Sequence, residues 1–149
     1  MNGAVIYPVQ LGKESGVREA YRVLVLDDEP AICNLVRDSL ARAGHDVVCT
    51  QEAEEALAML EYRPFDVLVA DLKLGSPFHT EGLDLIGEAR YHAPHLGIVV
   101  HTGECDEALH QSCLSNGADE IVLKTETIAA LRAAVIRAGR RKEVSDVAS

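Results

Sequence analysis

The sequence predicts a doubly wound α/β domain, in which helices cover both faces of one parallel sheet. Five apolar runs alternate with five segments of helical periodicity, and the runs lie at about residues 22–27, 45–49, 66–70, 96–101 and 119–123. These runs are continuously apolar rather than alternating, which indicates strands that are buried on both faces. Strands that alternate with helices through right-handed crossovers then give a five-stranded parallel sheet.

Proline and glycine residues mark the ends of the first two predicted helices. A helix is expected from about Pro30 to Ala43, because proline suits a first helical turn and Gly44 suits a helix end. A second helix is expected over about residues 52–62, before Pro64.

Three further helices are expected, at about residues 82–91, 104–115 and 126–140. Pro94 and Gly117 mark the ends of the first two of these. A long loop over about residues 72–81 precedes the first.

Length and composition suit one domain without a nucleic-acid-binding face. The chain has 149 residues, 48% of them hydrophobic, and a net charge of −10, which disfavours nucleic acid and membrane surfaces as partners. We expect a domain over residues 22–140, a flexible arm at residues 1–21 and a polar tail at residues 141–149. No stretch resembles a membrane span or a secretory signal, so a cytoplasmic location is expected.

The cysteines, the histidines and a cluster of basic residues are expected to have structural roles. The four cysteines show no paired spacing and are expected to be free thiols in a reducing compartment, with Cys49 and Cys113 in the core. The six histidines lack metal-ligand spacing, so packing or surface roles are favoured. Arg137, Arg140, Arg141 and Lys142 suit a helix C-terminus, with a partner-binding patch as the alternative.

Polar residues follow four of the predicted strands. Asp27 and Asp28 end the first strand, Asp71 the third, and Thr102 and Lys124 the fourth and fifth. The carboxyl ends of parallel strands share one edge of the sheet, where such folds bind ligands. Three acids, a hydroxyl and an ammonium at one edge suit a divalent cation and a phosphoryl group.

The chemistry of these groups favours a phosphorylated carboxylate. Mg²⁺ prefers oxygen ligands, and a bound cation would keep Asp71 ionised and therefore nucleophilic. Lys124 could balance the added charge, and Thr102 could donate a hydrogen bond to a phosphoryl oxygen. The simpler alternative, in which Asp28 caps the first helix, accounts for Asp28 alone.

These motifs resemble the receiver domains of bacterial two-component response regulators over about residues 22–140. The resemblance rests on Leu26-Asp-Asp-Glu-Pro30, Asp71-Leu72, Thr102-Gly103, Gly117-Ala-Asp119 and Lys124. It implies a flavodoxin-like sheet with strand order 2-1-3-4-5.

The resemblance also implies roles for individual residues. Asp71 would be the phosphoacceptor. Asp28 would bind Mg²⁺ directly, Asp27 mostly through water, and Lys73 through its backbone carbonyl. Thr102 and Lys124 would contact the phosphoryl group.

The chain departs from the receiver pattern at three places. Ile121 stands where receivers commonly carry an aromatic switch residue, and Thr125 stands where proline usually follows the lysine. The glycine that usually lies eight residues after the phosphoacceptor corresponds to Gly82, three residues late. The loop at residues 73–81 is therefore expected to be enlarged.

Two residues beside the site are expected to modulate it. The Lys73 side chain could lie over the phosphoryl group and hinder an attacking water, which would give a long-lived phosphorylated state suited to relay. Gly103 leaves that side of the site open to a bulky phosphoryl donor.

The resulting hypothesis is a stand-alone single-domain response regulator, a signalling switch rather than an enzyme acting on other substrates. A sensor histidine kinase or a histidine phosphotransfer protein would phosphorylate Asp71. Output would go through protein docking by the fourth helix, fifth strand and fifth helix. A non-switching pseudo-receiver is the alternative that Ile121 and Thr125 favour. An Mg²⁺-dependent phosphatase is a weaker one, because Lys73 stands where a second acid is usual.

Overall fold

The computed structural model describes residues 20–74 and 80–148, with side chains through residue 141. The expectations for most of the N-terminal arm and for residues 75–79 of the long loop fall outside the described residues.

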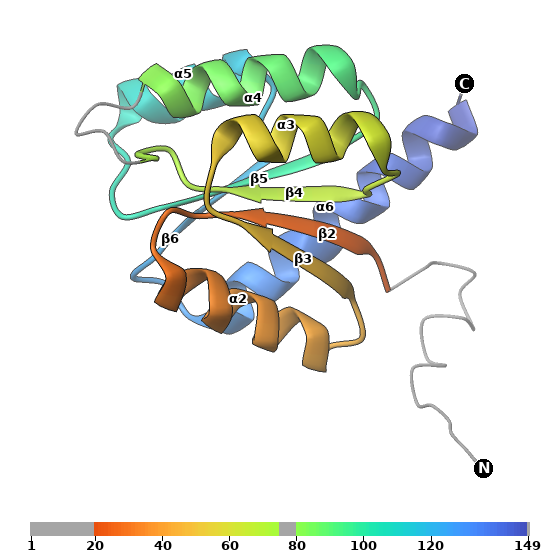
Figure 1. Ribbon diagram of the computed structural model, residues 1–149. Coiled ribbons are helices and arrows are strands. Elements are labelled where there is room, and N and C mark those ends of the chain that lie inside the picture. The colour runs from red at the N-terminus through yellow and green to blue at the C-terminus, as the bar shows by residue number, and fades with distance from the viewer. Residues whose placement is uncertain (1–19, 75–79, 149) are drawn as a thin grey trace.

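Five parallel strands form one sheet, as predicted. In the order in which they lie side by side, they are β3 (Asp46–Thr50), β2 (Arg22–Leu26), β4 (Val67–Ala70), β5 (Gly97–Thr102) and β6 (Glu120–Leu123) (Figure 1). This is the expected order 2-1-3-4-5, and each neighbouring pair is parallel. β4 and β5 are buried along their whole length, which explains their continuous apolar character.

Helices cover both faces of the sheet (Figure 1). On one face lie α2 (Pro30–Arg42) and α6 (Ile128–Ala148), and on the other lie α3 (Ala53–Tyr62), α4 (Thr80–His92) and α5 (Glu107–Asn116). Each face has its own hydrophobic core, to which successive strand residues contribute in alternation; Leu24 belongs to one core and Val25 to the other. No helix in the described part of the chain is long and apolar enough to cross a membrane.

Three of the predicted helix ends are confirmed. Pro30 lies in the first turn of α2. Gly44 and Gly117 follow α2 and α5 with φ of 100° and 114°, the left-handed region that favours glycine. The start of α5 was placed too early: the helix begins at Glu107, because the Asp106 side chain accepts a hydrogen bond from the backbone N–H of Leu109.

The expected end of the last helix at about residue 140 is wrong, because α6 continues to Ala148 and so includes most of the segment expected to be a polar tail. Gly139 does not end the helix; it lies buried against the Tyr21 ring, where a larger residue would not fit. Because α6 continues beyond the arginines, they do not lie at a helix C-terminus. Arg137 instead pairs with Glu120 at 2.9 Å, and Arg141 with Asp119 at 2.6 Å.

Candidate metal and phosphoacceptor site

Three carboxylates meet at the carboxyl edge of the sheet. Carboxylate oxygens of Asp27, Asp28 and Asp71 all lie within 4.8 Å of one another. Backbone bonds that extend the ladder hold two of these residues: Asp71 N–H donates to Leu26 O at 2.9 Å, and Asp27 N–H donates to Thr50 O at 3.2 Å. The cluster forms because β2 and β4 are neighbours that end at the same level.

Lys124 is the counter-ion of this cluster. Its Nζ lies 2.9 Å from Asp27 Oδ2, 3.3 Å from Asp71 Oδ2 and 3.5 Å from Glu29 Oε1. Its backbone N–H donates to Thr102 O at 2.7 Å, which fixes the end of β6 beside β5. Burial alone would lower the pKa of Lys124, but the hydrogen bond to Asp27 and the charge of Asp71 raise it overall.

The acids outnumber the cation inside the site. Burial raises the pKa of Asp27, and the negative charge of Asp71 adds to this rise; hydrogen bonds from Lys124 and from the Glu29 N–H only partly oppose it. One ammonium therefore faces three carboxylates whose donor atoms are all oxygen. Such a donor set fits a hard divalent cation such as Mg²⁺.

The hydroxyl of Thr102 is unsatisfied within the described part of the chain. Its side chain is fully buried at the end of β5, and no hydrogen-bond partner of Oγ1 lies among the described residues. A buried hydroxyl without a partner costs stability, typically about 1–3 kcal/mol. A phosphoryl group at the acid cluster would supply the missing acceptor.

Comparison with known proteins identifies the family. The sequence profile of the response regulator receiver domain matches residues 23–136. The chain belongs to the response regulator receiver family. Among curated relatives, AruR of Pseudomonas aeruginosa is 36% identical over 108 residues, which cover 69% of this chain and 43% of that protein. TrcR of Mycobacterium tuberculosis is 32% identical over 131 residues, which cover 85% of this chain and 50% of TrcR. Both are named transcriptional regulatory proteins, and this chain spans about half of their length.

Solved receiver structures share the fold. A CheY-like receiver domain from Methanospirillum hungatei superposes with a TM-score of 0.76 at 25% identity and covers 83% of this chain and 97% of that one. A Burkholderia pseudomallei response regulator has a TM-score of 0.71 at 26% identity, and the match covers 84% of this chain and 72% of that one. That structure contains a phosphorylated aspartic acid, a calcium ion and citrate.

In this receiver, Lys73 points toward the loop that follows β5. Its Nζ lies 3.7 Å from Glu104 Oε1, and its backbone N–H lies 3.4 Å from Asp71 Oδ1. Both paired side chains are exposed, by 42% and 80%. The role of the Lys73 carbonyl as a metal ligand stays a prediction. Beside Gly103, no atom of residues 20–74 or 80–148 lies within 4 Å of where a Cβ would be, and access of a bulky donor on this side stays a prediction.

The two atypical positions have different surroundings. Ile121 in β6 is half-buried, pairs with Val100 and packs against the core on the side of α3, α4 and α5. After Lys124, the Glu126 carboxylate accepts the Leu123 N–H at 2.8 Å and closes the turn. The described peptide bonds are all trans, so Thr125 follows Lys124 through a trans bond.

Sequence reasoning missed three glutamates at the site. Glu29, Glu104 and Glu126 contact Lys124, Lys73 and the end of β6 respectively. Each stands within two residues of a predicted site residue, which is the only signal that the sequence offers. The Asp28 cap alternative is wrong, since α2 has no side-chain cap and Glu29 occupies its N-cap position.

His101 lies beside Thr102 in β5 and is buried. Burial, together with the positive charge of Lys124, lowers the pKa of His101 to about 4, although the charges of Asp71 and Glu126 act in the opposite direction. An unfolded histidine titrates near about 6.5. Between these two values the unfolded chain binds more protons than the folded receiver, so stability falls as the pH drops through this window.

Replacing His101 by glutamine should remove this pH dependence. We expect the His101 contribution to weaken the wild type by about 2 kcal/mol between pH 7 and pH 5. Urea unfolding at both pH values, followed by circular dichroism, measures the difference between wild type and His101→Gln. His110→Gln, on exposed helix α5, is the matched control. An equal loss of stability in wild type and His101→Gln would contradict the prediction.

Proposed function

We propose that this receiver accepts a phosphoryl group on Asp71 in an Mg²⁺-dependent reaction. The donor would be a phosphohistidine of a sensor kinase or of a phosphotransfer protein. The cluster of Asp27, Asp28 and Asp71 around a single ammonium carries the proposal. The bound metal would offset the negative charge that Asp71 and the phosphoryl group bring together.

The residues of the site have distinct tasks in the transfer. One carboxylate oxygen of Asp71 attacks phosphorus, the P–N bond of phosphohistidine breaks, and its electron pair stays on the imidazole nitrogen. Asp27 and Asp28 would hold the metal together with Asp71. Lys124 already contacts Asp71 and would pair with a phosphoryl oxygen, while the buried Thr102 hydroxyl would donate to another.

Output by protein docking is part of the proposal. The face formed by α5, β6 and α6 carries the end of β6, next to Lys124. The net charge of −10 argues against direct nucleic-acid contact by this domain. Leu114 on α5 is 42% exposed and would offer an apolar contact to a partner.

Intact mass after incubation with Mg²⁺ and acetyl phosphate tests the phosphoacceptor. Wild type should gain one phosphoryl group, and omission of Mg²⁺ or the change Asp71→Asn should abolish the gain. Asp38→Asn, an exposed acid on α2, is the matched control and should be phosphorylated like wild type. A gain that persists in Asp71→Asn would show that the site is elsewhere.

A second candidate is a non-switching pseudo-receiver that binds partners constitutively. It is favoured by Ile121, which leaves no aromatic ring to move toward Thr102. The test above separates the two, because a pseudo-receiver would gain no phosphoryl group from acetyl phosphate.

Lys73 is proposed to slow loss of the phosphoryl group. Its ammonium, now 3.7 Å from Glu104, could turn toward the phosphorylated Asp71 and obstruct the attacking water. Lys73→Ala should therefore lose the phosphoryl group several-fold faster than wild type. Glu104→Gln frees Lys73 from its partner and should slow the loss. Unchanged or slower decay in Lys73→Ala would exclude this role, and decay is followed by intact mass over time.

A further inference from the structure

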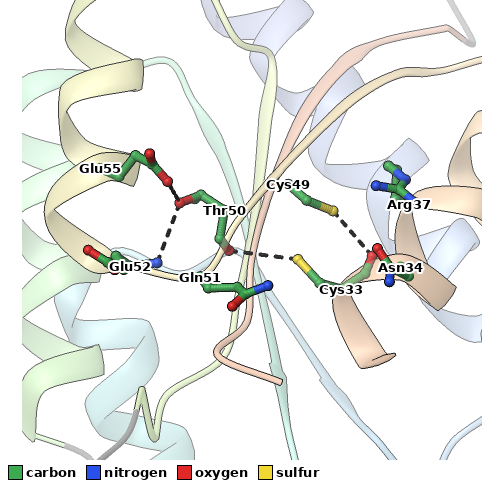
Figure 2. Close-up of a pocket in the computed structure, with 8 residues that line it drawn as sticks. All are labelled: Cys33, Asn34, Arg37, Cys49, Thr50, Gln51, Glu52 and Glu55. Atoms are coloured by element: carbon green, nitrogen blue, oxygen red, sulfur yellow. Dashed lines mark hydrogen bonds between the residues drawn. The ribbon is translucent and has the colours of Figure 1, made fainter. Parts of the chain in front are cut away.

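Two cysteines from different elements meet near the acid loop, the segment of residues 27–29 between β2 and α2 that carries Asp27 and Asp28. Cys33 lies in the first turns of α2, and Cys49 is in β3. Cys49 Sγ donates to Cys33 O at 3.2 Å, and Cys33 Sγ donates to Thr50 O at 3.7 Å. Both hydrogen bonds cross between the helix and the strand, so they hold the two residues side by side. Figure 2 shows both sulfur atoms in the gap between the helix and the strand.

The two cysteines border a cavity of about 370 Å³. The cavity lies at the end of β3, which is a strand at the edge of the sheet. Its wall includes both cysteines, Arg37 and Glu55 (Figure 2). Cys33 is 1% exposed, whereas Cys49 is half-buried. A small solute in the cavity can therefore reach Cys49 first, with Cys33 behind it.

We propose that Cys33 and Cys49 form an oxidisable dithiol site, which a small disulfide such as oxidised glutathione converts into an intramolecular disulfide. The Cys49 thiolate attacks one sulfur of the small disulfide, and one small thiol leaves. The Cys33 thiolate then attacks the Cys49 sulfur of the mixed disulfide, and the second small thiol leaves. The protein loses two hydrogens, and the small disulfide is reduced to two thiols.

The same surroundings make this reaction slow at neutral pH. Burial and the hydrogen bond with Cys33 raise the pKa of Cys49 to about 12. Little thiolate is then available, so the pair persists as thiols until oxidising conditions are sustained.

The bridge would act on the backbone that holds the acid loop. The Thr50 carbonyl accepts both the Cys33 thiol and the Asp27 N–H, and the Cys33 N–H donates to Glu29 O at 3.0 Å. A disulfide removes both thiol donors and draws α2 toward β3. We expect Mg²⁺ binding to weaken about fivefold on oxidation, the equivalent of one lost hydrogen bond.

Peptide mapping of the full chain after treatment with oxidised glutathione tests the bridge. Remaining thiols are alkylated, and the expected product contains a Cys33–Cys49 disulfide with Cys105 and Cys113 alkylated. Cys33→Ser should stop at a glutathione adduct on Cys49. Cys105→Ser is the control and should form the bridge as wild type does.

Two outcomes would overturn the site. One is a bridge between Cys105 and Cys113 while Cys33 and Cys49 are recovered in alkylated form. The other is a wild-type glutathione adduct that never resolves into the Cys33–Cys49 disulfide.

Calorimetric Mg²⁺ titration of the reduced and bridged forms tests the effect on the acid loop. Equal affinities would overturn the coupling to the metal site. If neither form bound Mg²⁺, the proposed phosphorylation would fail while the mapping result stood, so the two failures are distinguishable.

Discussion

Replacing Arg90 by methionine should destabilise the receiver by about 3–5 kcal/mol, because one guanidinium satisfies several groups at once. Its Nη1 donates to Leu96 O at 2.6 Å and to Pro94 O at 2.8 Å. Its Nη2 donates to Gly117 O at 2.8 Å and to Asp119 Oδ2 at 3.0 Å. Methionine fills similar space but leaves these acceptors without their donor.

The burial of Asp119 makes the expected loss large. Its side chain is 6% exposed, and the same oxygen that faces Arg90 also accepts the Ile98 N–H at 2.8 Å. Arg141 contacts the other carboxylate oxygen, but its own side chain is 60% exposed. Exposed ion pairs typically contribute about 0–1 kcal/mol, so Arg141→Met is the matched control and should lose little.

Urea unfolding followed by circular dichroism measures both variants. Equal losses in Arg90→Met and Arg141→Met would contradict the assignment of the structural role to Arg90. Because Arg90 joins α4 to the segments that start β5 and β6, its loss should affect the fold at the edge opposite the acid cluster. Mg²⁺ binding by the folded fraction should therefore remain.

Replacing Gly82 by alanine should destabilise the receiver by about 2–3 kcal/mol and also disturb Asp71, the proposed phosphoacceptor. A Cβ at this position would overlap the backbone carbonyl and Cα of Leu72. Backbone cannot rotate away as a side chain can, so either α4 or the Leu72 segment must shift. Leu72 directly follows Asp71, and we expect slower phosphorylation of the variant as well as a lower free energy of unfolding.

Gly87→Ala is the matched control within the same helix. A Cβ there would lie 3.3 Å from the Asn116 side-chain oxygen, which can move aside. Alanine in a helix interior is more favourable than glycine by about 1 kcal/mol, so this change should be neutral or stabilising. Urea unfolding and the rate of phosphorylation by acetyl phosphate compare the two variants. Equal free energies of unfolding and equal phosphorylation rates of the two variants would show that a Cβ at residue 82 fits beside Leu72.

The sheet and its functional edge could be predicted because their signals are local. Strands buried on both faces are continuously apolar, and the polar residue that ends each strand marks its carboxyl end. Gly82 was identified as a displaced glycine by its position alone, and the structure shows why glycine is needed there. The loop between Asp71 and Gly82 is expected to be enlarged, and its residues 75–79 lie outside the described residues.

Long-range contacts account for what the sequence did not reveal. Arg90 reaches groups 27 and 29 residues away, and nothing near it in the chain marks these partners. The length of α6 was underestimated because the arginines were assigned to a helix end, whereas Arg137 and Arg141 pair with acids near β6. The shape of the turn after Lys124 did not follow from the sequence, because Thr125 replaces the usual proline. In the structure, the Glu126 side chain closes this turn by accepting the Leu123 N–H.

The position of β6 has a consequence for the order in which the receiver assembles. The acids of the site lie on β2 and β4, but their ammonium comes from the end of the last strand, at the sheet edge. Until that strand docks, Asp27 and Asp71 face each other without a counter-ion, and mutual repulsion opposes the joining of their strands. A divalent cation can take the place of Lys124 during this interval, so Mg²⁺ should speed refolding as well as stabilise the finished receiver.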